Sequence, residues 1–160
     1  MTLIETLADV KPGSALAEAM ENRAEILRLS EAAHNAVLLP RDPGGLSHGL
    51  RAALAARMAR HNSNEALADH YDTLVDRAAE SETSLLAQPG TNLDDARTSE
   101  IVRHADRLTL APRESTRGHI EALRSAGVTD ADIVRLSELA AFVNYQVRVI
   151  AGLKLIGARK

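Results

Sequence analysis

The chain has 160 residues, a formal net charge of -3 and 45% hydrophobic residues, and it contains no cysteine. This length and apolar content argue against disorder, so we expect a single folded domain over residues 1–160. Without cysteine the chain has no disulfide, no thiolate metal site and no cysteine nucleophile. The weakly acidic charge gives no electrostatic reason to expect nucleic acid or an anionic membrane as a partner.

The sequence also argues against secretion and against a membrane span. The N-terminal residues include Glu5 and Asp9 and no basic region, so they do not resemble a secretory signal. Residues 139–158 are the most apolar stretch, but they include Arg148 and Lys154, which would be costly at a bilayer centre. We therefore expect a cytoplasmic protein that does not cross a membrane.

Helical periodicity dominates the sequence, and the β-branched alternation that is typical of strands is absent. A short N-terminal segment ends at residues 12–14, and Ser14 can cap a helix over residues 15–38. A break near Asn22 divides this region into two helices. Residues 40–45, which contain two prolines and two glycines, predict a loop.

Two more helices follow this loop. Ser47 can cap the first, and its apolar stripe has steps of four through Leu46, Leu50, Leu54 and Met58. Residues 61–64 interrupt the pattern, and the second helix is expected over residues 64–80. Residues 81–92 are polar and include Pro89-Gly90, so we predict a mobile linker there.

Three helices complete the prediction. One covers residues 93–110 and is closed by Pro112, and a shorter one covers residues 116–126 with Gly127 at its C-terminal cap. In the last helix, apolar residues step by 3-4-3-4-3 through Ile133, Leu136, Ala140, Val143, Val147 and Ile150. A second apolar face on this helix predicts that it is central in the bundle or shared with another subunit.

A group of matches to a known helix pair lies within residues 50–71, and the matching residues are Leu50, Arg51, Arg57, Ala59 and Asn62. This segment resembles the signature helices of the alkylhydroperoxidase D-like and carboxymuconolactone decarboxylase superfamily. Redox members of that superfamily read roughly L-R-E-L, R-V-A, N-G-C-x-x-C and H-H. Peroxidase-related members are similar to this chain in three further segments: Ala105–Thr109, Ile120–Gly127 and Phe142–Arg148.

The resemblance covers about residues 22–157. It implies an all-α fold, a compact bundle of about six or seven helices of the alkylhydroperoxidase D-like type. Members of the superfamily are usually homo-oligomers, so the resemblance also implies that copies of this chain self-associate.

The catalytic residues of the redox branch are not carried over. Its acidic residue falls on Ala52, its two cysteines fall on Asn64 and Leu67, and its histidine falls on Tyr71, next to His70. Because no thiolate is present, thiol peroxidase chemistry has no nucleophile. The decarboxylase branch also lacks the cysteine pair, so its chemistry stays open. That branch resembles a site with an acid and a histidine, however, and Ala52 removes the acid.

The remaining polar residues suggest a pocket for a small carboxylate or lactone. Arg57 and His61 are four residues apart on one helix, and Asn144 and Arg148 have the same spacing on the last helix. An arginine would pair with the anion and a histidine or tyrosine would move a proton. The candidate catalytic residues are His61, His70 and Tyr71, and the candidate ligand-binding residues are Arg57, Asn64, Asn144 and Arg148.

The same residues also have a purely structural interpretation. In it, Arg148 satisfies helix C-terminal carbonyls or a buried carboxylate, and His61 caps the helix at the break. The six histidines form no HxxxH or HExxH pair, so we expect no metal and no cofactor. His104 is expected on a solvated helix face beside Arg103 and Arg107.

Three functions are compatible with the sequence. A cofactor-free enzyme that acts on a small lactone or carboxylate would have a semi-buried cavity lined by the polar candidates. A scaffold, or a partner subunit of a cysteine-bearing paralogue, would have a large apolar interface. A binding module for a hydrophobic ligand would have an apolar tunnel.

Overall fold

The computed structural model describes residues 1–91 and 93–158, and every regular element in them is helical. In chain order the elements are α1 (Leu3–Leu7), α2 (Ala15–Glu21), α3 (Ala24–Leu38), α4 (His48–His61), α5 (Glu65–Ala78), the 3₁₀-helix η1 (Ser81–Ala87), α6 (Ala96–Leu110), the 3₁₀-helix η2 (Pro112–Glu114), α7 (Arg117–Ser125) and α8 (Asp130–Gly157). The all-α prediction is confirmed. The described elements outnumber the predicted six or seven helices, because the chain forms a further short helix at the N-terminus and two 3₁₀ turns.

Local sequence explains where several helices begin and end. The side-chain oxygens of Ser14, Ser47 and Thr129 each accept a hydrogen bond from the backbone three residues on, as N-caps do. The predicted break is also present, since α2 ends at its C-cap Asn22 and α3 begins at Ala24. Gly127, after α7, has φ +82°, a value that favours glycine at a helix C-terminus.

Helix α4 is the most deeply buried element, and every residue from Gly49 to Ala59 is buried. It pairs with α5 across the short connection at residues 62–64 and also packs against η1, α6 and α8. Five of these buried residues are alanines, whose small side chains let neighbouring helices approach closely. The 50–71 segment therefore forms paired helices beside the terminal helix.

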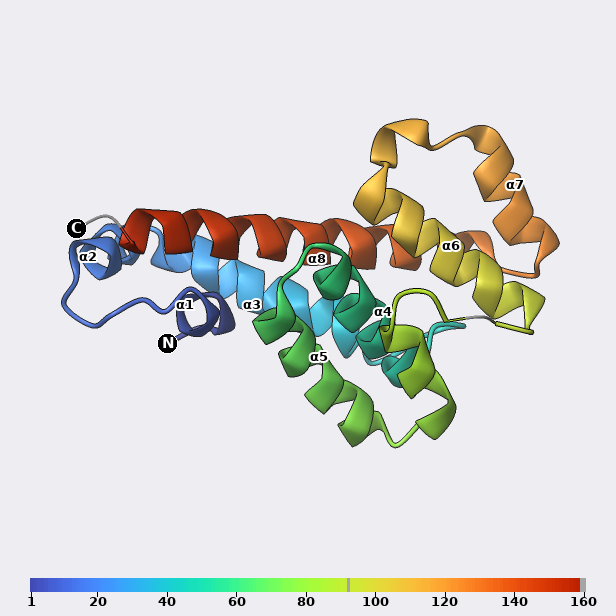
Figure 1. Cartoon of the computed structure of the whole chain (residues 1–160), viewed down its shortest axis with the longest axis horizontal. Coiled ribbons are helices and arrows are strands. Elements are labelled where there is room, and N and C mark those ends of the chain that lie inside the picture. Colours follow the sequence, from blue (N-terminus) through green and yellow to red (C-terminus); the bar gives the residue numbers. More distant parts are fainter. Residues whose placement is uncertain (92, 159–160) are drawn as a thin grey trace.

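Helix α8 is central in the fold, as its two apolar faces predicted. It contacts α1, α2, α3, α4, α6 and α7. Figure 1 shows α3 and α8 side by side along the longest axis, with α1 and α2 at one end and α6 and α7 at the other. By length and hydropathy α8 would also suffice to cross a membrane, and in the fold 44% of its most apolar window is buried against the other helices.

The prediction of a mobile linker over residues 81–92 is wrong for the first half of that segment. Residues 81–87 form η1, and Leu86 and Ala87 are only 5% and 3% exposed. Leu86 and Ala87 supply an apolar anchor that the polar composition of the segment concealed, and η1 packs against α4. Asn92 lies outside the described residues.

The expectation that His104 lies on a solvated face is also wrong. His104 is only 3% exposed, and neither nitrogen of its ring has a hydrogen-bond partner in the described part of the chain. His104 is next to Ala105 and one turn from Ile101, both fully buried residues of α6. Burial lowers the pKa of His104, and the nearby charge of Arg107 acts in the same direction.

We predict that His104→Leu stabilises the protein by about 1 kcal/mol at pH 7, because an unsatisfied buried imidazole is removed. Since the folded pKa of His104 lies below the ordinary histidine value of about 6.5, the unfolded state binds more protons as the pH falls below that value. The wild-type protein should therefore lose more stability between pH 7 and about pH 5 than the leucine variant does. Urea unfolding followed by circular dichroism measures both effects. His104→Gln keeps a buried polar group, and equal stabilisation by both variants would contradict the explanation.

Candidate functional site

Arg57 on α4 and His61 on the same helix come together, but they do so around an internal carboxylate. The Nε and Nη2 atoms of Arg57 donate to the two carboxylate oxygens of Asp106 on α6, over 2.6 and 2.7 Å. The Nε2 atom of His61 lies 2.9 Å from Asp106 Oδ1. A bidentate pair of this kind is the strongest geometry for arginine and carboxylate.

The third nitrogen of the Arg57 guanidinium is also used. Its Nη1 atom donates to the backbone oxygens of Gln88 at 2.5 Å and Leu86 at 3.4 Å. Arg60, one turn later, donates through Nη1 to the backbone oxygen of Ala87 at 3.1 Å. Both arginines therefore attach the C-terminal end of η1 to α4. The guanidinium of Arg57 is already neutralised by a carboxylate of the same chain.

Asn144 on α8 connects three helices. Its Nδ2 atom donates to Thr109 Oγ1 on α6 at 3.2 Å, and its Oδ1 atom accepts from Asn62 Nδ2, at the end of α4, at 3.2 Å. Arg148 is exposed instead, and its Nη1 atom donates to the backbone oxygen of Asn144 at 3.1 Å. Arg148 therefore has a structural contact, but its acceptor is a mid-helix carbonyl of α8 and neither a helix C-terminal carbonyl nor a buried carboxylate.

Tyr71 and His70 on α5 belong to a second, aromatic cluster. The hydroxyl of Tyr71, which is fully buried, donates to Gln146 Oε1 on α8. The Nε2 atom of half-buried His70 lies 3.2 Å from the Nε2 atom of His34 on α3. The rings of His34 and Tyr71 are nearly parallel, with centroids 6.1 Å apart. Phe142 meets His34 edge-on.

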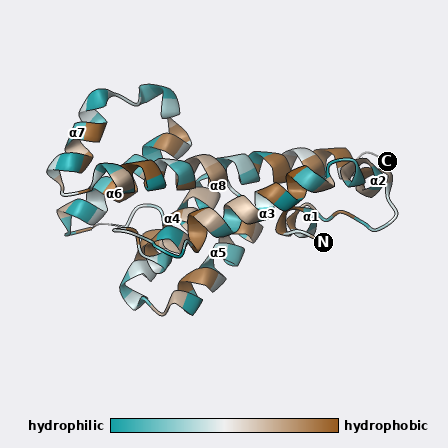
Figure 2. Cartoon of the chain, turned by 180° about the vertical axis from the view of Figure 1, so that it is seen from behind, coloured by the Kyte–Doolittle hydropathy of each residue, from teal (hydrophilic) through white to brown (hydrophobic). Residues whose placement is uncertain are grey.

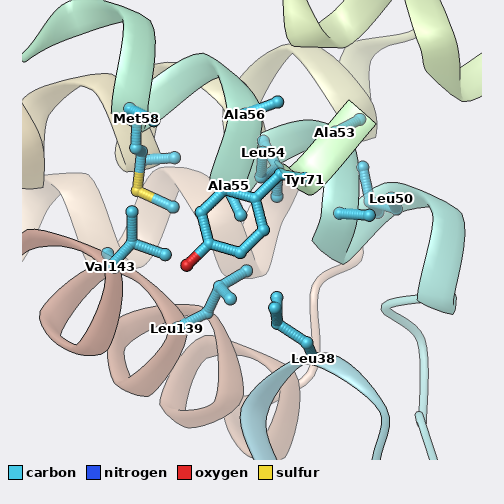
Figure 3. Packing of buried hydrophobic residues seen from close by; sticks show 14 of the residues in the cluster. Leu38, Leu50, Ala53, Leu54, Ala55, Ala56, Met58, Tyr71, Leu139 and Val143 are labelled. Atoms are coloured by element: carbon cyan, nitrogen blue, oxygen red, sulfur yellow. The ribbon is translucent and has the colours of Figure 1, made fainter. Parts of the chain in front are cut away.

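Burial sets the protonation of this cluster. Desolvation lowers the pKa values of His34 and His70 and raises the pKa of Tyr71. Both imidazoles are therefore neutral at pH 7, so one Nε2 carries the hydrogen and the other accepts it. Such a pair can pass a proton between half-buried His70 and buried His34. Figure 3 shows the Tyr71 ring enclosed by side chains that include Ala55, Met58, Leu139 and Val143.

The positions that the superfamily resemblance assigns to catalysis have structural roles in this chain. Asn64 is the N-cap of α5, and its Oδ1 atom accepts from the backbone nitrogen of Leu67 at 3.2 Å. Leu67 itself is fully buried, and Ala52 is 2% exposed. A cap, a core leucine and a core alanine thus occupy the places of the two cysteines and the acid.

The seven candidate residues do not converge on one site. Arg57 and His61 lie at Asp106, His70 and Tyr71 lie in the aromatic cluster, and the other three, Asn64, Asn144 and Arg148, make the separate contacts described above. Two surface cavities, of about 670 and 520 Å³, lie near the chain ends and between η1 and α6, and no candidate residue lines either of them.

Sequence reasoning missed Asp106, His34 and Gln146. Asp106 lies inside the matching segment 105–109, but at a position where the motif allows any residue, so the motif could not identify it. The one available signal was that a buried arginine such as Arg57 requires an anion. His34 and Gln146 are distant in sequence from the residues they contact. No local spacing could therefore have identified them.

Comparison with known proteins identifies the fold. No family model matches the sequence, and no curated protein matches it. The structure is similar to the crystal structure of an uncharacterized peroxidase-related protein from Silicibacter sp. TM1040, with a TM-score of 0.70 and 24% sequence identity. The match covers 81% of this chain and 68% of that chain. The chain therefore has an all-helical, peroxidase-related fold.

We predict that Asp106→Ala destabilises the protein by roughly 3 kcal/mol, because it leaves the guanidinium of Arg57 buried without its anion. Thermal and urea unfolding measure the loss. Asp130→Ala is the matched control, since Asp130 forms a solvent-exposed pair with Arg124 that contributes little. Similar unfolding midpoints for the two variants would show that the Arg57–Asp106 pair does not stabilise the fold.

Proposed function

We propose that this chain is a cysteine-less, non-redox protein with a peroxidase-related fold, and that it acts as a scaffold subunit that self-associates. The observation that supports this most directly is the Arg57–Asp106 ion pair. Arg57 matches the superfamily motif, yet all three of its guanidinium nitrogens bind groups of the same chain. Asn64 and Leu67 likewise contribute to a helix cap and to the core.

An exposed apolar surface supports self-association. Ile26 and Leu29 on α3 are 45% and 48% exposed. They precede Ser30 by one turn and by one residue, and the Ser30 hydroxyl lies 2.9 Å from the hydroxyl of Tyr145 on α8. Tyr145 is itself 38% exposed, and Figure 2 shows hydrophobic positions along both helices. Neighbouring exposed apolar side chains of this kind are typical of surfaces that bind another protein.

The first expected outcome concerns redox chemistry. The purified protein should not reduce an alkyl hydroperoxide with a dithiol donor, because no side chain can form the sulfenic acid that this reaction requires. Peroxide consumption measured against a buffer blank tests this. Turnover that persists after repurification and scales with protein concentration would refute the non-redox proposal.

The second expected outcome concerns assembly. Light scattering at micromolar concentration should give a mass well above the 17.2 kDa of one chain. Leu29→Glu should reduce this mass, because it puts a charge into the apolar surface. Leu85→Glu changes another exposed leucine, on η1, and serves as the control. A wild-type monomer would contradict the assembly proposal.

One observation favours a second function, a cofactor-free acid–base enzyme for a small lactone or carboxylate. His70 and His34 share a hydrogen bond, and His70 is half-buried, so it connects the buried ring to solvent. A neutral imidazole is a suitable general base near pH 7. Hydrolysis of simple lactones that is abolished by His70→Gln, with the fold intact by circular dichroism, would support this alternative.

A further inference from the structure

The outward side of α8 carries a regular series of residues, which we call the outer stripe: Val134, Glu138, Ala141, Tyr145, Arg148 and Gly152. The steps between them alternate between four and three, the spacing by which one helix faces another. Val134 is 57% exposed and Tyr145 is 38% exposed, and Glu138, Ala141 and Arg148 are also exposed. Apart from its two charges, the stripe is made of apolar or small residues and one tyrosine.

The outer stripe is symmetric about Val143. Each member has a counterpart at the same distance along the helix on the other side, so Glu138 corresponds to Arg148 and Ala141 corresponds to Tyr145. If a second copy of α8 lies antiparallel on the first with its two-fold axis near Val143, each residue meets its counterpart. A two-fold interface has this property, because every contact occurs twice.

The counterparts are complementary in size. Ala141 faces the partner's Tyr145, and Val134 faces the partner's Gly152, so a larger side chain meets a smaller one each time. A Cβ atom added at Gly152 would have no heavy atom within 4 Å, so the space beside this glycine is open in the single chain. Small residues opposite large ones allow two helices to interlock closely.

The counterparts are also complementary in charge. Neither Glu138 nor Arg148 has an ion-pair partner within residues 1–91 and 93–158, and the only described bond of Arg148 is to its own helix backbone. In the antiparallel arrangement Glu138 faces the partner's Arg148, and this pair forms twice. A parallel arrangement in the same register would bring Glu138 against the partner's Glu138 instead.

We propose that a second copy of this chain docks on the outer stripe, with the two α8 helices antiparallel and Glu138 of each copy paired with the partner's Arg148. This rests on the proposed self-association and specifies its geometry. Ile26 and Leu29 are exposed on α3, the helix whose Ser30 hydroxyl lies 2.9 Å from the hydroxyl of Tyr145. In the proposed dimer they extend the contact, since one helix alone buries less area than stable interfaces require. The charge pair selects the orientation and the apolar residues supply area.

Charge reversal tests the pairing. Glu138→Arg and Arg148→Glu should each raise the dissociation constant of the dimer at least about tenfold, because each places like charges together at two sites. An equimolar mixture of the two variants should recover the association, since every contact then joins opposite charges. The double variant should recover it as well. Arg113→Glu reverses an exposed charge on η2 and should have no effect.

Sedimentation velocity over a range of concentrations measures each constant, and circular dichroism confirms that each variant is folded. A wild-type monomer would overturn both the proposed function and this pairing. A wild-type oligomer that both single reversals leave intact, or whose loss the mixture does not repair, would overturn the pairing alone.

Crosslinking gives a second measurement. Because the chain has no cysteine, Ala141→Cys and Tyr145→Cys each introduce a single thiol. On mild oxidation, a mixture of these two variants should form disulfide-linked dimers faster than either variant alone. Equal rates for the mixture and the separate variants would count against the antiparallel register.

Discussion

The arrangement of the fold depends on how α4 neutralises the charge that it carries into the core. This helix is buried along most of its length, so Arg57 has no access to water. Asp106 supplies the anion from α6, and backbone oxygens after η1 bind the remaining donor. One guanidinium thus joins three elements that are far apart in the sequence. A buried charge is tolerated only when an opposite charge pairs with it or its donors are hydrogen-bonded, and for Arg57 Asp106 supplies the opposite charge.

A similar requirement governs Arg51, a turn and a half earlier on α4. Its residue is 2% exposed, and three of its nitrogens donate to the backbone oxygens of Val37, Pro43 and Leu46 at 2.8 to 2.9 Å. These bonds hold the loop between α3 and α4 in place. The arginines that match the superfamily motif can therefore be retained for architecture alone, which is why a motif match does not by itself identify a catalytic site.

Much of the fold follows from local sequence, and little of the candidate site does. The helices of residues 15–38, 47–61 and 129–157 were predictable because cap residues and apolar steps act over a few positions. The burial of His104, the packing of η1 and the pairing of Arg57 with Asp106 were not, since each depends on which distant helix lies opposite. The polar candidates were grouped by spacing along single helices, and the fold directs those helices toward different neighbours.

The burial of Leu67 and Tyr71 has a consequence for any attempt to place thiol chemistry on this chain. Cysteines introduced at positions 64 and 67 would not create a peroxide-reducing centre, because the first would replace a helix cap and the second would be enclosed in the core. The tyrosine hydroxyl, committed to Gln146, offers no base to ionise a thiol. Several neighbouring side chains would have to change together, so packing as well as the absence of cysteine opposes thiol redox chemistry at these positions.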